Sequence, residues 1–251
     1  MEKTYISVIL SFVSITICKG GLLPSYITPC DLKDKDFSGC IKGQIENALP
    51  KFTKGIPELG VPSIDPVKLH NIYIDGNGLN MSFTKVSMHG LSNSKLTDMK
   101  VDIGKSEEKF SLKFKVDLNL TSQYEVDGKI LILPIKGNGD SVIQAHGVEV
   151  AINSILSHVK KDDTDHLKLV DPSYEYTIDK TIFHFDNLFN GNKQLSDTTH
   201  QFANENWEQL MDELAPPVIK QIVAPCVKVI NKFFLAVSID EMIKNYQNTL
   251  S

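Results

Sequence analysis

Between residues 67 and 185, apolar and polar side chains alternate along the chain with a period of two. In the clearest run, Phe110–Leu120, every even position is apolar and every odd position is polar. This alternation predicts a strand with one buried face and one solvated face, and it is typical of antiparallel sheets. Further strands are expected at Val67–Ile74, Leu79–Met88, Leu96–Ile103, Tyr124–Leu133, Asp140–Val150 and Tyr174–Phe185.

Short polar segments that contain glycine predict the turns between these strands. They are Asp75-Gly76-Asn77-Gly78, Asp127-Gly128 and Asn138-Gly139, residue types that favour tight hairpin turns. Within the same zone, Val148–Val159 is compatible with a short helix, and Lys160–Asp165 is expected to be a solvated loop.

The two ends of the chain have helical periodicity instead. An amphipathic helix is expected at Ser38–Phe52, ended or kinked by Pro50, and the proline-rich segment Gly55–Pro66 predicts an extended linker. A long helix is expected from Leu195 to about Val237, with its apolar face rotating at a kink or break near Pro216-Pro217.

The long helix is apolar over much of its circumference, so another element must cover it. The alternating strands provide an apolar face of the required kind. The sequence therefore predicts an α+β fold in which a curved antiparallel sheet wraps around a long C-terminal helix.

Composition and charge exclude several classes of protein. The chain has 251 residues, of which 23% are charged, and a formal net charge of −5. This composition is typical of a globular protein rather than a disordered one. The basic residues are scattered along the chain and form no concentrated cluster, which argues against nucleic acid or an anionic membrane as the main partner.

The N-terminus predicts export. Residues 1–20 combine Lys3, a short apolar run and small residues at Cys18 and Gly20, as a signal peptide does, and the run is too short for stable membrane insertion. Residues 21–251 are expected to form one secreted, extracellular, monomeric domain. An oxidising compartment favours a disulfide between the neighbouring Cys30 and Cys40, and leaves Cys226 as a small buried hydrophobe.

Two glycosylation sequons, at Asn80 and Asn119, are predicted glycosylation sites, because an exported chain can be glycosylated. No catalytic, metal or cofactor motif is recognisable in the sequence. The seven histidines form no metal-ligand pair such as HExxH, and the hydrolase motif GxSxG is absent. The sequence therefore predicts a protein that is not an enzyme and that needs no cofactor.

Periodicity alone cannot distinguish a solid core from one that surrounds a ligand, but three motifs carry a resemblance that bears on the question. They are Gly55–Pro66 after the Cys30 and Cys40 pair, Leu131-Ile-Leu-Pro-Ile-Lys-Gly-Asn-Gly139, and Asn187–Leu195 continuing to Phe202–Leu210. In this order they resemble the signatures of the insect takeout and haemolymph juvenile-hormone-binding family, over essentially the whole mature chain.

The resemblance implies a secreted insect carrier that encloses a terpenoid, a fatty acid or another lipid-like molecule in a tubular apolar cavity, with links to feeding or circadian regulation. Juvenile-hormone carriers proper have a second disulfide, for which Cys226 has no partner, so the takeout branch is favoured. The alternatives are such a hormone carrier, or a signalling module that acts through a protein receptor. The residues expected to line the tunnel are Leu112, Phe114, Val116, Leu118, Tyr124, Ile130, Ile132, Tyr174, Tyr176, Trp207 and Leu210.

Overall fold

The computed structural model describes residues 23–76, 78–103 and 108–246. Its central feature is a hairpin of two long antiparallel strands, β6 (Lys109–Ile130) and β7 (Leu133–Lys161), which pair from the hairpin turn at Ile130 and Leu133 to Lys109 and Ile155. The predicted antiparallel sheet is built on this hairpin, and the signal peptide expected at residues 1–20 lies outside the described residues.

Shorter strands pair end to end along the two outer edges of the hairpin. Along β6, β4 pairs with the half nearer the turn and β5 with the other half. Along β7, β9 and β8 are arranged in the same way, and β2 and β3 extend the sheet beyond β4. These strands are β2 (Val67–Lys68), β3 (Ile72–Gly76), β4 (Leu79–His89), β5 (Lys95–Asp102), β8 (Thr164–Thr177) and β9 (Lys180–Phe185). Among the described residues, the eight-stranded sheet is curved but does not close into a barrel.

A bulge divides the long hairpin near its middle. The pairing register of β6 against β7 shifts between Val116 and Leu118. At this point the Gly147 N–H donates a hydrogen bond of 2.7 Å to the Asp117 carboxylate, and Gly147 has a φ of 59°, in the left-handed region that favours glycine. A bulge increases local twist and bends the strands, so the two halves of the sheet curve independently.

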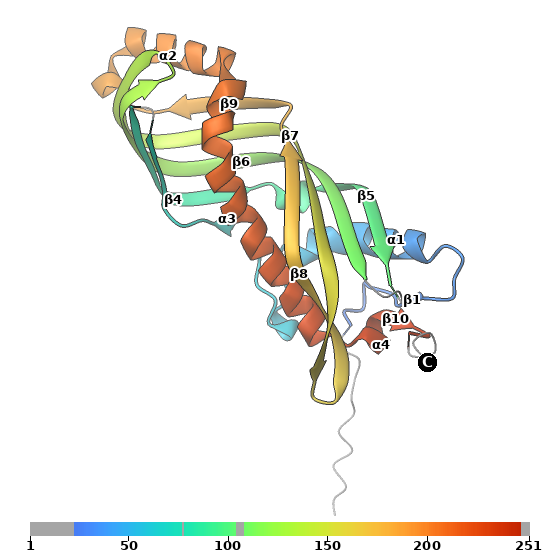
Figure 1. The fold of residues 1–251 in the computed structure, drawn as a ribbon. Helices are drawn as coiled ribbons and strands as arrows, with labels where there is room; N and C mark the ends of the chain where they lie inside the picture. The colour runs from blue at the N-terminus through green and yellow to red at the C-terminus, as the bar shows by residue number, and fades with distance from the viewer. Residues whose placement is uncertain (1–22, 77, 104–107, 247–251) are drawn as a thin grey trace, which may run out of the picture.

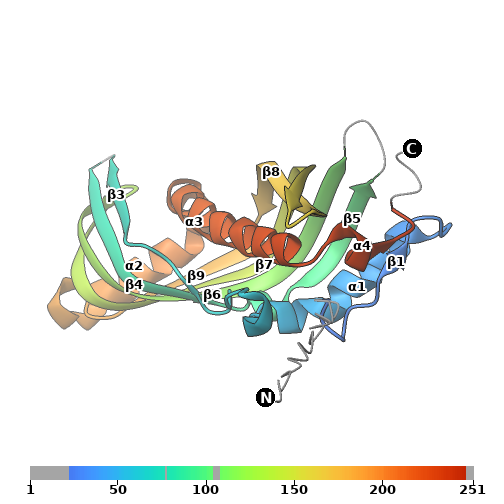
Figure 2. The ribbon, with the colours of Figure 1, turned by 90° about the horizontal axis from the view of Figure 1, so that it is seen from below.

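The helices lie on the concave side and at the two ends of the sheet. Figure 1 shows α3 running diagonally along the molecule, with α2 at one end and α1 at the other. Figure 2 shows the sheet curving beneath α3. The helices are α1 (Phe37–Phe52), α2 (Lys193–Glu205), α3 (Trp207–Ala236) and α4 (Ile239–Met242), with short 3-10 helices η1 (Pro57–Leu59), η2 (Leu91–Asn93) and η3 (Phe189–Gly191).

Two asparagines join the helices to the free edges of β8 and β9. The Asn231 side chain of α3 accepts a 2.7 Å hydrogen bond from the Leu169 N–H and donates a 3.0 Å bond to the Leu169 carbonyl. Asn204 of α2 binds Phe183 of β9 in the same two-point manner. An edge strand exposes unpaired backbone groups, so these amides both satisfy the sheet edge and fix the position of the helices.

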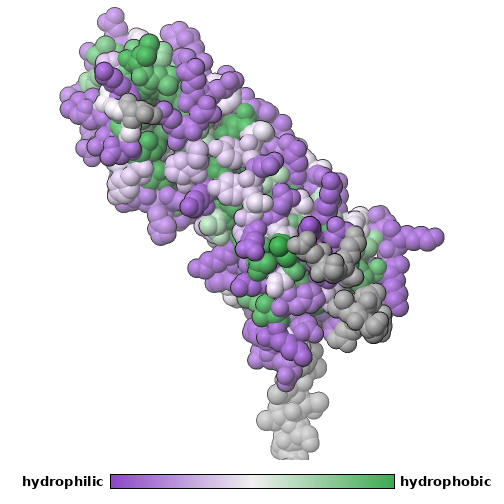
Figure 3. Space-filling model, viewed as in Figure 1, coloured by the Kyte–Doolittle hydropathy of each residue, from purple (hydrophilic) through white to green (hydrophobic). Residues whose placement is uncertain are grey.

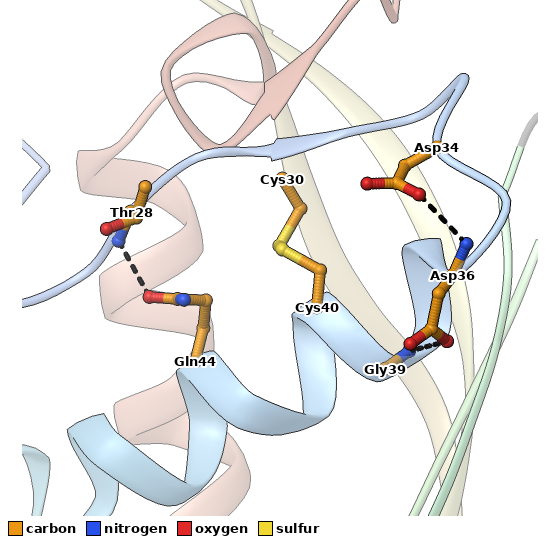
Figure 4. The surroundings of a disulfide bond; sticks show 7 residues. All are labelled: Thr28, Cys30, Asp34, Asp36, Gly39, Cys40 and Gln44. Carbon is orange, nitrogen blue, oxygen red and sulfur yellow. Dashed lines mark hydrogen bonds between the residues drawn. A yellow bond between two sulfur atoms is a disulfide. The ribbon is translucent and has the colours of Figure 1, made fainter.

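The disulfide predicted between Cys30 and Cys40 is present. It joins α1 to β1 (Cys30–Asp31), which in turn pairs in parallel with the C-terminal β10 (Ile243–Lys244). Figure 4 shows the start of α1, where the Asp36 carboxylate accepts the Gly39 N–H as a helix cap. The N-terminal helix is thereby held against the strand β10.

Several predicted boundaries of the strands are wrong. The expected strand Phe110–Leu120 and the following residues as far as Ile130 are one continuous strand, whereas the expected strand Tyr124–Leu133 is cut by the turn that leads into β7. The helix considered at Val148–Val159 is the second half of β7. In contrast, Val67–Ile74 is interrupted between β2 and β3, and Tyr174–Phe185 is interrupted between β8 and β9. The expected loop Lys160–Asp165 is a tight hairpin turn between β7 and β8.

Two glycines within the long hairpin, Gly128 and Gly139, were predicted to form turns. They instead allow another part of the backbone to approach closely. A Cβ on Gly128 would lie 2.2 Å from the Gly78 carbonyl oxygen, and one on Gly139 would lie 2.8 Å from that of Asp186. Glycine within a strand commonly marks such an approach of another backbone. The actual β6–β7 turn consists of Leu131 and Ile132. Neither is one of the polar or glycine residues that usually form such turns.

The long C-terminal helix is broken, but not at the prolines. Pro216 and Pro217 lie within α3, whereas the chain bends at Asn206, between α2 and α3. The Asn206 side chain and backbone N–H both bind the Phe202 carbonyl. This asparagine therefore ends α2 and allows α3 to start in a new direction along the sheet.

An apolar cavity between helix and sheet

A cavity of about 270 Å³ lies in the half of the molecule that contains α1. Its walls come from α1, from β5 to β8 and from the C-terminal two thirds of α3, with α4 and β10 at one side. The volume is close to the lower end of the ~300–1,000 Å³ range of small-molecule sites. Sequence elements from both ends of the chain and from its centre therefore meet around one internal space.

The lining is almost entirely apolar. Among the described residues it contains no Asp, Glu, Lys, Arg or His. Its aliphatic and aromatic members on the sheet and on α3 include Val101, Phe110, Leu112, Phe114, Val116, Leu118, Val150, Ile152, Leu156, Leu167, Ile219, Ile222, Val223, Ile230, Phe233 and Phe234. A space lined in this way attracts apolar surface and excludes ions, because an unpaired charge loses its hydration there.

The polar side chains of the lining gather around α1 and the neighbouring η2 segment. They are Thr28, Gln44, Thr53 and Ser94. Gln44 Oε1 accepts a 2.7 Å hydrogen bond from the Thr28 N–H, as Figure 4 shows. The Thr53 hydroxyl lies 3.1 Å from both the Leu49 carbonyl oxygen and Ser92 Oγ. The cavity thus has one side with neutral hydrogen-bonding groups, while the remainder offers only apolar contact.

Asp65 fixes the η2 wall of the cavity. Its carboxylate accepts hydrogen bonds from the Gly90 N–H at 3.1 Å and from the Ser92 N–H at 2.8 Å, and a further one from the Ser92 hydroxyl. Burial opposes ionisation, but these hydrogen bonds outweigh it and hold the pKa of Asp65 below its usual value. The segment Gly55–Pro66, which was expected to be an extended linker, is therefore fixed in place and forms part of the cavity wall next to Leu91.

Cys226 faces this space from α3, and burial raises the pKa of its thiol to about 12. The thiol is therefore neutral at physiological pH and has little nucleophilic character. This agrees with the prediction that Cys226 acts as a small hydrophobe.

The structure places four of the predicted tunnel residues in the cavity lining: Leu112, Phe114, Val116 and Leu118. The second core, at the α2 end of the molecule, instead contains Tyr124, Ile130, Trp207 and Leu210. Tyr174 and Tyr176 of β8 pack against the first core but do not line the cavity. Ile132 is 79% exposed at the β6–β7 turn, so its expected place in the tunnel wall is wrong.

The hydroxyl group of Tyr124, a residue expected to line the tunnel, forms a hydrogen bond within the fold. It donates a 2.6 Å hydrogen bond to the Asp186 carbonyl, and its ring contacts that of Phe185. Burial, together with the nearby Asp186 charge, raises the pKa of Tyr124 to about 12. This tyrosine fastens the segment after β9 to the sheet.

Sequence reasoning missed the α1 and α3 walls of the cavity. Ile41, Ile45, Ile222 and Ile230 have the right helical spacing, but this pattern is the same for a helix that packs on a solid core. Only the separation of α1 from α3 across the cavity distinguishes the two cases, and no local pattern encodes it.

Other candidate chemistry lies outside the cavity. The Ser87 hydroxyl is 3.2 Å from His89 Nε2 and accepts a hydrogen bond from Lys68, but none of the three lines the cavity. Within the described ranges, no group of three or more His, Cys, Asp or Glu is placed to hold a metal, and no helix has the length and apolar character needed to cross a bilayer.

The two sequons differ in their surroundings. Asn80 is exposed on β4, whereas Asn119 is half-buried on β6, with its Oδ1 enclosed and lacking a hydrogen-bond partner. Figure 3 shows one face of the molecule, on which polar residues dominate and apolar residues appear in several places, one of them near α2. The exposed Ile132 and Leu195 belong to this end of the molecule.

Comparison with known proteins agrees with this architecture. The family model for haemolymph juvenile hormone binding protein matches residues 7–244. The chain belongs to this family. Among solved structures, the chain is similar to Epiphyas postvittana Takeout 1, which is 29% identical and superposes with a TM-score of 0.79, over 87% of this chain and 100% of that one.

Two relatives by sequence extend the comparison within the haemolymph juvenile hormone binding protein family. The circadian clock-controlled protein daywake of Drosophila melanogaster is 26% identical over 244 residues, which cover 93% of each chain. The juvenile hormone-binding protein of Manduca sexta is 26% identical over 102 residues, which cover 39% of this chain and 42% of that one. The predicted takeout-like family and α+β fold are confirmed.

Proposed function

We propose that this protein is a secreted, monomeric carrier that encloses one neutral hydrophobic molecule in the cavity between α1, the sheet and α3. The observation that carries the proposal is the space of about 270 Å³ whose described lining has no ionisable group other than the neutral Cys226 thiol. Family membership and the Cys30–Cys40 disulfide support an extracellular location, since disulfides persist in oxidising compartments.

The binding energy comes from removing the ligand from water. Each buried CH₂ group contributes roughly 0.8 kcal/mol, so about ten such groups gain roughly 8 kcal/mol. That gain offsets much of the cost of association and of ordering a flexible ligand. The mechanism requires neither catalysis nor a cofactor.

The lining favours a ligand with a neutral polar group, such as an ester, an alcohol or a ketone. A carboxylate in this cavity would find no Lys, Arg or His among the described lining residues, and an unpaired buried charge costs several kcal/mol. A neutral oxygen can instead accept a hydrogen bond from the Gln44 amide or the Ser94 hydroxyl at the α1 side. Terpenoid esters and similar lipids therefore fit better than free fatty acids.

A paired comparison tests this proposal. A methyl ester and its parent fatty acid compete for the protein against an environment-sensitive fluorescent probe, at a pH where the acid is ionised. We expect the ester to bind at least tenfold more tightly than the acid. Equal affinity would contradict the neutral-ligand proposal, and failure of both ligands and of the probe would contradict the carrier function and favour a receptor-binding role.

A further inference from the structure

Two separate hydrophobic cores meet beneath the middle of α3. The first surrounds the cavity, and the second fills the α2 end of the molecule. Four side chains pack against both cores and form what we call the partition: Leu69, Leu120, Met211 and Val218. They come from the β2–β3 connection, from β6 and from α3, so the partition crosses the molecule from sheet to helix.

The order of residues along β6 and α3 places the partition at the inner end of the cavity. On β6 the last lining residue is Leu118, and Leu120 is the next side chain on the same face. On α3 the last lining residue is Ile219, and Val218 precedes it. Beyond these positions lie residues of the second core, such as Tyr124.

The walls that bound the cavity are long between the partition and the opposite end. From Phe110 to Leu118 the β6 wall spans ~26 Å at about 3.3 Å per residue. From Ile219 to Phe234 the α3 wall spans ~22 Å at about 1.5 Å per residue. A cavity of about 270 Å³ over such a length suits an extended chain rather than a compact ring system.

Behind the partition, the described residues of the second core leave little space. The second core contains a space of only about 10 Å³, lined by residues such as Leu79 and Phe183, which is at most the size of one water molecule. A ligand that continues past Leu120 and Met211 must displace these partly buried side chains, which pack against both cores, and displacing packed side chains is costly.

We propose that the partition is a length gauge that sets the longest ligand this carrier accepts. The inference rests on the proposed function and adds a specificity determinant to it. Each CH₂ added to a ligand chain gains about fourfold in affinity, the equivalent of roughly 0.8 kcal/mol, until the chain end reaches Leu120 and Met211. Further groups then gain nothing, because they remain in water or must compress the partition.

The test uses a series of straight-chain alkyl acetates, which are neutral and differ only in length. Dissociation constants are measured by displacement of a fluorescent probe from the full mature chain. For the wild type, affinity should rise steadily with length and then stop rising. Leu120→Ala and Met211→Ala each remove three non-hydrogen atoms. In both variants the length limit should move to chains longer by about one to three CH₂ groups, and these longer chains should bind about tenfold more tightly than they bind the wild type.

Leu79→Ala is the matched control, because Leu79 is buried in the second core outside the partition. It should lower the melting temperature as Leu120→Ala does, yet leave the length limit unchanged. Leu120→Val removes a single carbon and serves where the alanine variants fold poorly; its limit should move by about one CH₂ group.

The outcomes separate the two proposals. If the wild type binds no acetate of any length, the carrier function fails. If the wild type binds with a clear limit that Leu120→Ala, Leu120→Val and Met211→Ala all leave in place, the length gauge fails while the carrier function stands. A limit that moves equally in Leu79→Ala would also overturn the gauge, since it would reflect general loosening.

Discussion

Replacement of Cys226 by phenylalanine should stabilise the unliganded protein and block its ligand site. Cys226 faces the cavity from α3, and phenylalanine adds five non-hydrogen atoms there. At roughly 0.8 kcal/mol per buried carbon, the gain is at most about 4 kcal/mol, and repacking strain reduces it to a net ~1–3 kcal/mol. The melting temperature should therefore rise by about 2–10 °C.

The same substitution removes space that the ligand would occupy. A ligand that loses contact for about four or five carbon atoms loses roughly 3–4 kcal/mol, or between a hundredfold and a thousandfold in affinity. Thermal unfolding of Cys226→Phe, with and without a neutral long-chain ester, measures both effects. The ligand-induced rise in melting temperature should shrink as the unliganded melting temperature increases.

Val229→Phe is the control on the same helix. Val229 is buried in the first core but is not part of the cavity lining, so phenylalanine has no space there and should cost about 1–3 kcal/mol. Its ester affinity should stay close to wild type. If Cys226→Phe destabilises the protein as much as Val229→Phe does and keeps wild-type affinity, the cavity is not the ligand site and the reasoning is refuted.

Three further changes test the fold around the cavity. Asn231→Ala removes both hydrogen bonds between α3 and β8 and should cost about 1–3 kcal/mol in urea unfolding, whereas the exposed Lys228→Ala should change almost nothing; equal effects would exclude this anchoring role. Cys40→Ser opens a loop between residues ten apart and should cost about 2.7 kcal/mol on the chain-entropy estimate, and a loss under 0.5 kcal/mol would contradict it. The pKa of Asp65 is lowered in the folded state, so the stabilisation by its carboxylate is complete above its unfolded pKa of about 3.9 and is lost as pH falls through the folded value. Asp65→Asn should therefore flatten the fall of the unfolding free energy with decreasing pH. An unchanged slope would show that other groups cause this fall.

The sequence was most informative where the pattern was long and regular. The alternation from Phe110 to Leu120 correctly predicted a strand with an inward apolar face, and Leu112 to Leu118 on that face line the cavity. The helical periodicity after Leu195 correctly predicted helix over most of the C-terminal segment. These features depend on local periodicity, which one stretch of chain expresses by itself.

Other features depended on contacts between distant segments. Gly128 and Gly139 look like turn residues, but they admit the backbone of Gly78 and Asp186 across the sheet. Ile132 continues an apolar run, yet it lies at a hairpin turn in water. The partition could not be predicted for the same reason, because Leu120 occupies the same kind of position in the alternating run as the lining residue Leu118.

Photo-crosslinking can locate a bound ligand within the protein. A neutral long-chain ester that carries a diazirine is bound to the intact mature protein and activated with light, and the modified peptides are identified by mass spectrometry. The account predicts modification of the cavity wall on β6, from residue 110 to 118, and on α3, from residue 219 to 234, with an excess of unlabelled ester preventing it. Modification confined to the α2 end or to the outer face of the sheet would contradict the account.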